Sequence, residues 1–161
     1  MVEIRPARPG EGQALYDVTA AAIAARAPGF YSPAQVAAWM DCRDAAHYEQ
    51  VIAEGAVRVA VRDGEVVGFV DSAPGVLLRL FVRPDIAGQG LGRRLLELGV
   101  QAAMLDGQVR LEATLHATAF YTRFGFVETG RVVFQHPLGG LPVEVVSMVL
   151  RVPGLMSGPA V

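Results

Sequence analysis

The chain has 161 residues, a formal net charge of −2 and a hydrophobic fraction of 52%. This length and composition fit one folded domain with a sizeable core, and they exclude a disordered chain. The slightly acidic balance argues against general nucleic-acid binding, because phosphate contacts need a basic surface. All 14 basic residues are Arg. The absence of Lys excludes lysine Schiff-base chemistry and a Walker P-loop.

The sequence carries no pattern that indicates a membrane span, a signal peptide or disulfides. Its apolar stretches are interrupted by Arg, Asp or Gly and stay below the roughly 18–20 residues that cross a bilayer. The N-terminal residues lack a basic-then-apolar pattern, so we expect a cytoplasmic protein without membrane contact. Cys42 is the one cysteine. It excludes an intramolecular disulfide and a cysteine-rich metal site, and we expect no metal.

The N-terminal part of the chain begins with a strand and continues with helices. The pattern predicts a strand at 2–7 and an Ala-rich helix at 10–26 that ends at Pro28-Gly29. Ser32-Pro33 marks the start of a short helix, with a Ser cap and Pro at the first helical position. Another short helix is expected at 44–53.

From residue 56 the pattern takes the period of strands, at 56–62, 65–72 and 76–82, with a hairpin turn at Asp63-Gly64. A helix at 90–105, a strand at 109–114, a short helix at 117–123 and strands at 126–135 and 143–151 follow. We expect an α+β fold: a mixed, mostly antiparallel sheet of about seven strands with helices on both faces. Residues 1–152 should form this single domain and residues 153–161 a loose C-terminal tail.

A glycine-rich turn between a predicted strand and a predicted helix is the most informative segment. Leu80-Phe81-Val82 leads into Gly88-Gln89-Gly90-Leu91-Gly92, where the helix begins. Glycines let the backbone approach a ligand, and the free N–H groups of a helix N-terminus favour phosphate. By itself the segment also fits a turn without a ligand. A Rossmann fingerprint fits poorly, because Arg93 holds the position of its last glycine.

The turn resembles the acetyl-CoA-binding motif of the GNAT superfamily of N-acetyltransferases. Gly90 and Gly92 match the last two glycines of Arg/Gln-x-x-Gly-x-Gly/Ala, whereas Ala87 stands at the first position. The order of elements resembles the GNAT fold over nearly the whole chain. The resemblance implies acetyl-CoA as co-substrate. Arg93, in the first turn of the helix, either offsets Ala87 as a phosphate partner or is a solvated helix residue. The implied CoA-binding residues are Leu80, Phe81, Val82, Gly88, Gln89, Gly90, Leu91, Gly92, Arg93 and His116.

A second segment, residues 111–126, resembles the second CoA motif of the same family. Phe120-Tyr121 and Gly125-Phe126 match that motif, and His116 stands where the family often has Asn. The resemblance implies splayed strands that leave a slot for the pantetheine arm, with neutral His116 as a hydrogen-bond donor. It also places Tyr121 where a weak acid protonates the leaving CoA thiolate, although the ring could equally serve only in packing.

The family's usual reaction is direct attack of a neutral amine on the thioester. The sequence does not identify which residue is the general base of this reaction. Glu112 is the first choice, because one face of its strand can point toward the thioester. The alternatives are Asp71, His116, His136, Glu144 and a water chain. A backbone N–H at a bulge around residues 80–82 is expected to polarise the thioester carbonyl. Phe30 and Tyr31 are expected to line the acceptor pocket.

The sequence therefore predicts an N-acetyltransferase that moves an acetyl group from acetyl-CoA to a primary amine of a small molecule, in a ternary complex. Two other functions stay open: acetylation of a protein or peptide N-terminus, and a non-catalytic acyl-CoA-binding module. The sequence does not identify the acceptor, the acyl-chain preference or the oligomeric state. It is compatible with a homodimer.

Overall fold

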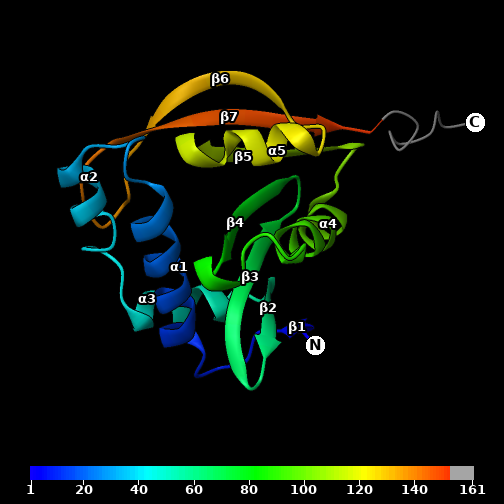
Figure 1. The fold of residues 1–161 in the computed structure, drawn as a ribbon. Coiled ribbons are helices and arrows are strands. Elements are labelled where there is room, and N and C mark those ends of the chain that lie inside the picture. The colour runs from blue at the N-terminus through cyan, green and yellow to red at the C-terminus, as the bar shows by residue number, and fades with distance from the viewer. Residues whose placement is uncertain (153–161) are drawn as a thin grey trace, which may run out of the picture.

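One twisted sheet forms the centre of the computed structural model, which describes residues 1–152. The predicted tail at 153–161 lies outside the described residues. Along the sheet the strands follow the order β1-β2-β3-β4-β5-β7-β6 (Figure 1). The strands are β1 (Glu3–Pro6), β2 (Val57–Arg62), β3 (Glu65–Ala73), β4 (Val76–Val82), β5 (Gln108–Thr114), β6 (Val127–Phe134) and β7 (Val143–Arg151).

Every neighbouring pair of strands is antiparallel except β4 and β5, which run parallel. The parallel pair follows from the helix that connects the two strands, since parallel strands need a long crossover. The mixed, mostly antiparallel α+β sheet predicted from the sequence is confirmed.

The helices are α1 (Gly12–Arg26), α2 (Pro33–Ala38), α3 (Ala45–Ala53), α4 (Leu91–Ala103) and α5 (Thr118–Arg123). The predicted start of α2 is confirmed: the Ser32 hydroxyl accepts from the Gln35 N–H at 3.1 Å, and the Gln35 side chain accepts from the Ser32 N–H at 2.9 Å. Asp44 caps α3 with its carboxylate, which accepts from the His47 N–H at 2.8 Å. No helix within residues 1–152 is long and apolar enough to cross a membrane.

Hydrophobic cores lie on both faces of the sheet, with α4 on one face and α1 on the other (Figure 1). On the α4 face, Gly99 lets the helix approach the strands closely. A Cβ at this position would lie only 2.5 Å from Leu77 and 2.6 Å from Val70. On the α1 face, Phe69 packs with Leu15 of α1 and Tyr48 of α3. Helices and hydrophobic side chains therefore cover both faces of the central strands.

A bulge interrupts β4 near its start. Leu77 pairs with Ser72 and Arg79 pairs with Asp71, so Leu78 is the extra residue. The sequence-based expectation of a bulge around residues 80–82 is wrong by two positions. The run Val76-Leu77-Leu78 is uniformly apolar, and its lack of alternation gives no sign of which residue is unpaired.

Candidate active site

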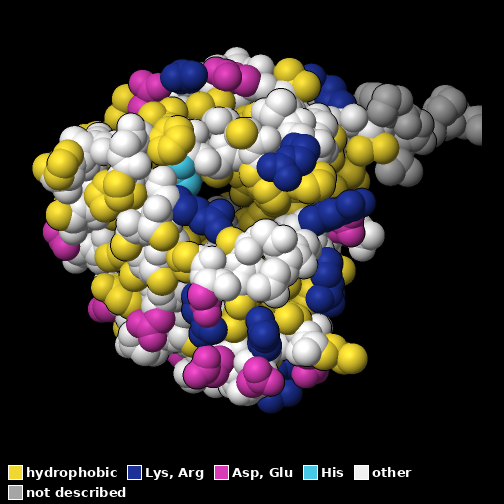
Figure 2. All heavy atoms as spheres, in the orientation of Figure 1, with side chains coloured by type: hydrophobic (Ala, Val, Ile, Leu, Met, Phe, Trp, Pro, Cys, Tyr) yellow, Lys and Arg dark blue, Asp and Glu magenta, His cyan; other side chains and the backbone are white. Residues whose placement is uncertain are grey.

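A gap opens between β4 and β5 in the middle of the sheet. The two strands pair only at Val76 and Arg110, and beyond that point β4 keeps β3 as its partner on one side alone. The gap widens into a cavity of about 730 Å³, lined by β4, β5, the glycine loop, α4, α5 and α1. Figure 2 shows the hollow, with apolar walls and arginine side chains around it. The splayed strands expected from the second motif are thus present in the fold.

The glycine loop forms one end of this cavity. Gly88 and Gly90 have φ angles of +82° and +83°, in the left-handed region that favours glycine. Gly90 is the N-cap of the 13-residue helix α4. A Cβ at Gly88 or Gly90 would meet no atom within 4 Å, so open space adjoins the loop backbone. Backbone N–H groups at the start of α4 can therefore approach an anion in the cavity.

Most of the residues predicted to bind CoA lie on the cavity wall. Gln89 and Leu91 do not: Gln89 is exposed on the loop, and Leu91 is buried in the core on the α4 face. The predicted residues that do line it are Leu80, Phe81, Val82, Gly88, Gly90, Gly92, Arg93 and His116. Ala87 lines it too, at the position where the resembled motif has Arg or Gln.

Arg93 and Arg123 supply positive charge at the α4 and α5 end of the cavity. Arg93 forms an exposed ion pair with Glu97 at 2.9 Å, and its guanidinium lies 6.0 Å from the centre of the Phe124 ring. An exposed pair of this kind is weak, so Arg93 can exchange Glu97 for a phosphate at little cost.

Tyr121 borders the cavity while its ring packs in the α4-face core. Its ring centroid lies 5.2 Å from that of Phe120 and 5.7 Å from that of Phe126. Burial raises the pKa of the Tyr121 hydroxyl, which is protonated throughout the physiological range. Among residues 1–152 no hydrogen-bond partner of this hydroxyl is found, so its proton is available to a ligand.

His116 lies in the short turn after β5, beside the opening of the cavity. Its Nε2 is 3.2 Å from the Thr114 hydroxyl, while its Nδ1 is buried without a hydrogen-bond partner among the described residues. Desolvation, and then the positive charge of Arg26, lower the pKa of the ring, so His116 is neutral at pH 7.

Tyr31 connects three segments of the chain through its hydroxyl. This hydroxyl accepts a hydrogen bond from the Leu115 N–H at 2.9 Å and donates one to the Glu144 carbonyl at 2.6 Å. Tyr31 is only 7% exposed, and this burial raises the pKa of its hydroxyl. Phe30, by contrast, is 56% exposed and its ring lies 6.1 Å from that of His116. Neither residue is part of the wall of the large cavity.

The structure separates the five candidate bases. Glu112 and His116 line the large cavity. Alternate residues of β5, such as Leu111 and Ala113, are buried on the α4 face, so Glu112 points to the α1 face. The other three are engaged elsewhere: Asp71 is buried and ion-paired with Arg79, the Glu144 carboxylate pairs with Arg131, and the ring of His136 lies 5.3 Å from that of His47.

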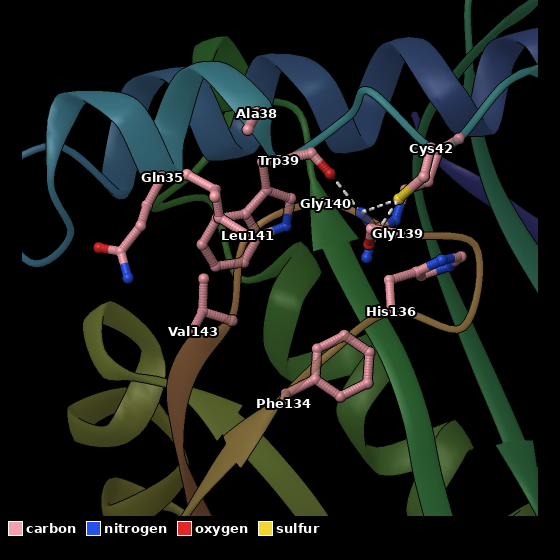
Figure 3. A pocket seen from close by; sticks show the side chains of 11 residues that line it. Gln35, Ala38, Trp39, Cys42, Phe134, His136, Gly139, Gly140, Leu141 and Val143 are labelled. Atoms are coloured by element: carbon pink, nitrogen blue, oxygen red, sulfur yellow. Dashed lines mark hydrogen bonds between the residues drawn. The ribbon is translucent and has the colours of Figure 1, made fainter.

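A second, much smaller pocket of about 20 Å³ lies between the α2–α3 segment and the β6–β7 loop (Figure 3). The Cys42 thiol donates to the Gly139 carbonyl at 3.4 Å, and the Gln35 amide donates to the Pro142 carbonyl at 3.0 Å. These contacts hold the loop against the helices. The pocket has room for about one water molecule, so it is a packing seam with no space for a substrate.

Several cavity residues were not singled out from the sequence. Arg123 and Phe124 fall inside the second motif, so their position between its matched residues is a signal that could have found them. Arg26 and Arg79 carry no such signal, because their place on the wall depends on how α1 crosses β4.

A family model described as "Acetyltransferase (GNAT) domain" matches residues 29–146. The chain belongs to the GNAT acetyltransferase family. It is therefore an acyltransferase of the N-acetyltransferase type. Among curated proteins it is 28% identical to "Uncharacterized N-acetyltransferase YafP" of Escherichia coli over 125 residues, 78% of this chain and 81% of YafP. It is also 39% identical to "Peptidyl-lysine N-acetyltransferase YjaB" of Salmonella typhimurium over 80 residues, a match that covers 48% of this chain and 54% of YjaB.

Solved structures of GNAT proteins share the fold. A GCN5-related N-acetyltransferase from Rhodopseudomonas palustris superposes with a TM-score of 0.80 at 22% identity, covering 93% of this chain and 95% of that one. The PaiA N-acetyltransferase from Thermoplasma acidophilum, solved in complex with coenzyme A, gives a TM-score of 0.71 at 17% identity and covers 94% and 99% of the two chains.

Proposed function

We propose that this N-acetyltransferase uses acetyl-CoA to acetylate a primary amine of a small molecule, by direct attack within a ternary complex. The observation that carries the proposal is the cavity itself. It passes through the sheet at the β4–β5 gap, so one ligand can enter from the α4 face and another from the α1 face. Two ligands that meet in one gap are what direct transfer needs.

The residues at the α4 end fit a CoA. Gly88, Gly90 and the start of α4 offer backbone N–H groups to its phosphates, and Arg93 and Arg123 add charge. The similar PaiA structure, a complex with coenzyme A, supports the same choice of ligand. When bound, acetyl-CoA supplies an activated acyl group in its thioester. The free edge of β4 along the gap leaves backbone groups for hydrogen bonds to the ligand.

Two side chains take the proton-handling roles in this proposal. Glu112 faces the α1 side of the gap, lines the cavity and accepts the amine proton as general base. Tyr121 presents a protonated hydroxyl at the cavity wall and donates a hydrogen bond to the departing sulfur as negative charge develops there. Backbone N–H groups of β4 polarise the acyl carbonyl. Because the amine attacks this carbonyl directly, the reaction needs no side-chain nucleophile.

The similarity to YjaB, which is called a peptidyl-lysine N-acetyltransferase, favours a lysine side chain of a protein as the second candidate acceptor. The two candidates differ in what the α1 face must admit. A lysine chain needs only a narrow entry, whereas a small molecule must be enclosed. The proposal also includes a cytoplasmic location. It does not specify an oligomeric state, and it is compatible with a homodimer.

The experiment combines binding with turnover. Calorimetry measures acetyl-CoA affinity, and a thiol reagent follows CoA release with a panel of amino acids, polyamines, free N-terminal peptides and a lysine peptide. Because Cys42 is the one thiol of the chain, a blank without acceptor corrects for it. Acetyl-CoA binding together with turnover of a small amine supports the proposal. Tight binding with no turnover across the panel would instead indicate an acyl-CoA-binding module.

A further inference from the structure

The large cavity is unusually rich in arginine. Its wall includes Arg26, Arg79, Arg93 and Arg123, against the single carboxylate of Glu112. Figure 2 shows arginine side chains on more than one side of the hollow. Phosphates of a bound CoA account for positive charge at only one end of the cavity, so the charge at the other end needs a separate explanation.

The four arginines divide between the two faces of the sheet. Arg93 belongs to α4 and Arg123 to α5, beside the glycine loop. Arg79 lies on the α1 face of β4, as does Phe81, whose ring is 5.7 Å from Phe69. Arg26 is in the last turn of α1 itself. In CoA the pantetheine arm separates the phosphates from the thioester, so Arg26 and Arg79 lie on the acceptor side of the thioester.

Of these two acceptor-side arginines, Arg79 is held in an ion pair, whereas Arg26 has no partner among the described residues. Arg79 is ion-paired with Asp71, which is 4% exposed, and the two charges largely cancel. Within residues 1–152, Arg26 has no ion-pair partner and donates no hydrogen bond to a side chain or backbone carbonyl. Its charge nevertheless acts on the cavity, because it contributes to lowering the pKa of His116.

We infer that the acceptor carries an anionic group close to its amine, and that Arg26 binds this group. The inference rests on the proposed function. A guanidinium matches a carboxylate or a phosphate through paired hydrogen bonds. Glu112 projects to the same face and receives the amine. One positive and one negative side chain at the acceptor end fit an amino acid or an aminoalkyl phosphate better than a polyamine or a basic peptide.

The charge of Arg26 also bears on the reaction. An amine attacks only in its neutral form, and a nearby cation disfavours the protonated form. Arg26 thus eases deprotonation of the bound amine while its hydrogen bonds retain the acceptor. A polyamine would meet the same repulsion without an anionic group to pair with Arg26, so its binding should be weaker than that of an anionic acceptor.

The test uses Arg26→Gln, which keeps a polar side chain and removes the charge. Arg58→Gln is the matched control, since Arg58 is exposed on β2 away from the cavity. Each enzyme is assayed with amino acids and with their carboxamides, which differ from them only in the carboxylate. Aminoethyl phosphate and ethanolamine form the second pair. Comparing variants on the same acceptor removes the effect of the different amine pKa values.

For the anionic acceptors, Arg26→Gln should raise KM about 10-fold with little change in kcat, as expected for lost binding of one charged hydrogen-bonding group. For the neutral partners KM should change less than about 2-fold, and Arg58→Gln should change neither. The pair with the larger response identifies carboxylate or phosphate. Equal effects of Arg26→Gln on both members of each pair overturn the inference.

A preference of the wild-type enzyme for polyamines or a lysine peptide also overturns the inference, while the proposed acetyl transfer would stand. Failure of every amine in the panel would instead contradict the proposed function, so the two failures are distinguishable. A binding readout completes the design: the N-acetylated product of an anionic acceptor should compete with that acceptor in the wild-type enzyme and about 10-fold more weakly in Arg26→Gln.

Discussion

Tyr121 combines a buried ring with a hydroxyl that no described residue binds. Its raised pKa lies above the value of about 8.5 that is ordinary for a thiol, so complete proton transfer to a thiolate is uphill. In the proposed reaction the hydroxyl stabilises the departing sulfur by a hydrogen bond as negative charge develops there.

The first prediction follows from this chemistry. Tyr121→Phe keeps the ring contacts with Phe120 and Phe126 and removes only the hydroxyl. We expect kcat to fall about 10²-fold, within the range for one positioned acid, with acetyl-CoA affinity nearly unchanged. Steady-state kinetics and calorimetry measure the two quantities. Normal turnover by the Phe variant would leave Tyr121 with a packing role alone.

Tyr31 supports the second prediction, which concerns stability. Tyr31→Phe leaves the Leu115 N–H and the Glu144 carbonyl without their shared partner at a buried position. Losing it should lower the free energy of unfolding by about 2 kcal/mol, as expected when buried polar groups become unsatisfied. Urea denaturation measures the change. Tyr16→Phe is the matched control, because among residues 1–152 the Tyr16 hydroxyl has no hydrogen bond, and it should shift the midpoint little.

At the scale of elements, the sequence predicted what local chemistry determines. The Ser32-Pro33 start of α2, the Asp63-Gly64 turn with φ angles of 51° and 80°, and the glycine loop each depend on a few neighbouring residues. The bulge at Leu78 and the position of Arg26 on the cavity wall depend instead on distant partners. A bulge is a property of two strands, and one strand's sequence does not specify it.

The third prediction concerns the glycine loop and α4 together. Gly92 has ordinary helical geometry, and a Cβ there would touch the Phe120 ring at 3.5 Å, a normal contact. Gly92→Ala should therefore fold as well as the wild type or be more stable by up to about 1 kcal/mol, because Ala favours helix. The resembled motif accepts Ala as well as Gly at this position, so Gly92→Ala should change acetyl-CoA affinity little. Gly92→Leu, whose longer side chain extends into the cavity, should weaken acetyl-CoA binding at least 10-fold.

Calorimetry measures the acetyl-CoA affinity of Gly92→Ala and Gly92→Leu, and thermal unfolding of the unliganded proteins measures their stability. Gly130→Ala is the control, since a Cβ at Gly130 would meet nothing within 4 Å and the residue lies outside the cavity. Unchanged acetyl-CoA affinity in Gly92→Leu would mean that the ligand does not approach the start of α4.

For the whole molecule, the decisive feature is how little connects the two parts of the sheet. Strands β1 to β4 form one ladder and β5 to β7 another, joined by pairing at Val76 and Arg110 alone. Packing of α4 and α5 in one shared core, and of α1 with β7 in another, adds further connections, as do the hydrogen bonds of the Tyr31 hydroxyl. A ligand in the gap touches both ladders and stabilises their arrangement, so substrate binding and global stability are linked.

The last prediction quantifies this linkage. At a concentration 100 times its Kd, acetyl-CoA should stabilise the fold by about 2.7 kcal/mol. For a domain of this size that corresponds to a rise in Tm of roughly 5–10 °C. Differential scanning calorimetry measures it, and pantetheine at the same concentration is the control, because it fills the gap without reaching the glycine loop. A negligible shift with saturating acetyl-CoA would contradict binding in the gap. An equal shift with pantetheine would locate the binding energy in the β4–β5 gap, away from Gly88, Gly90 and the start of α4.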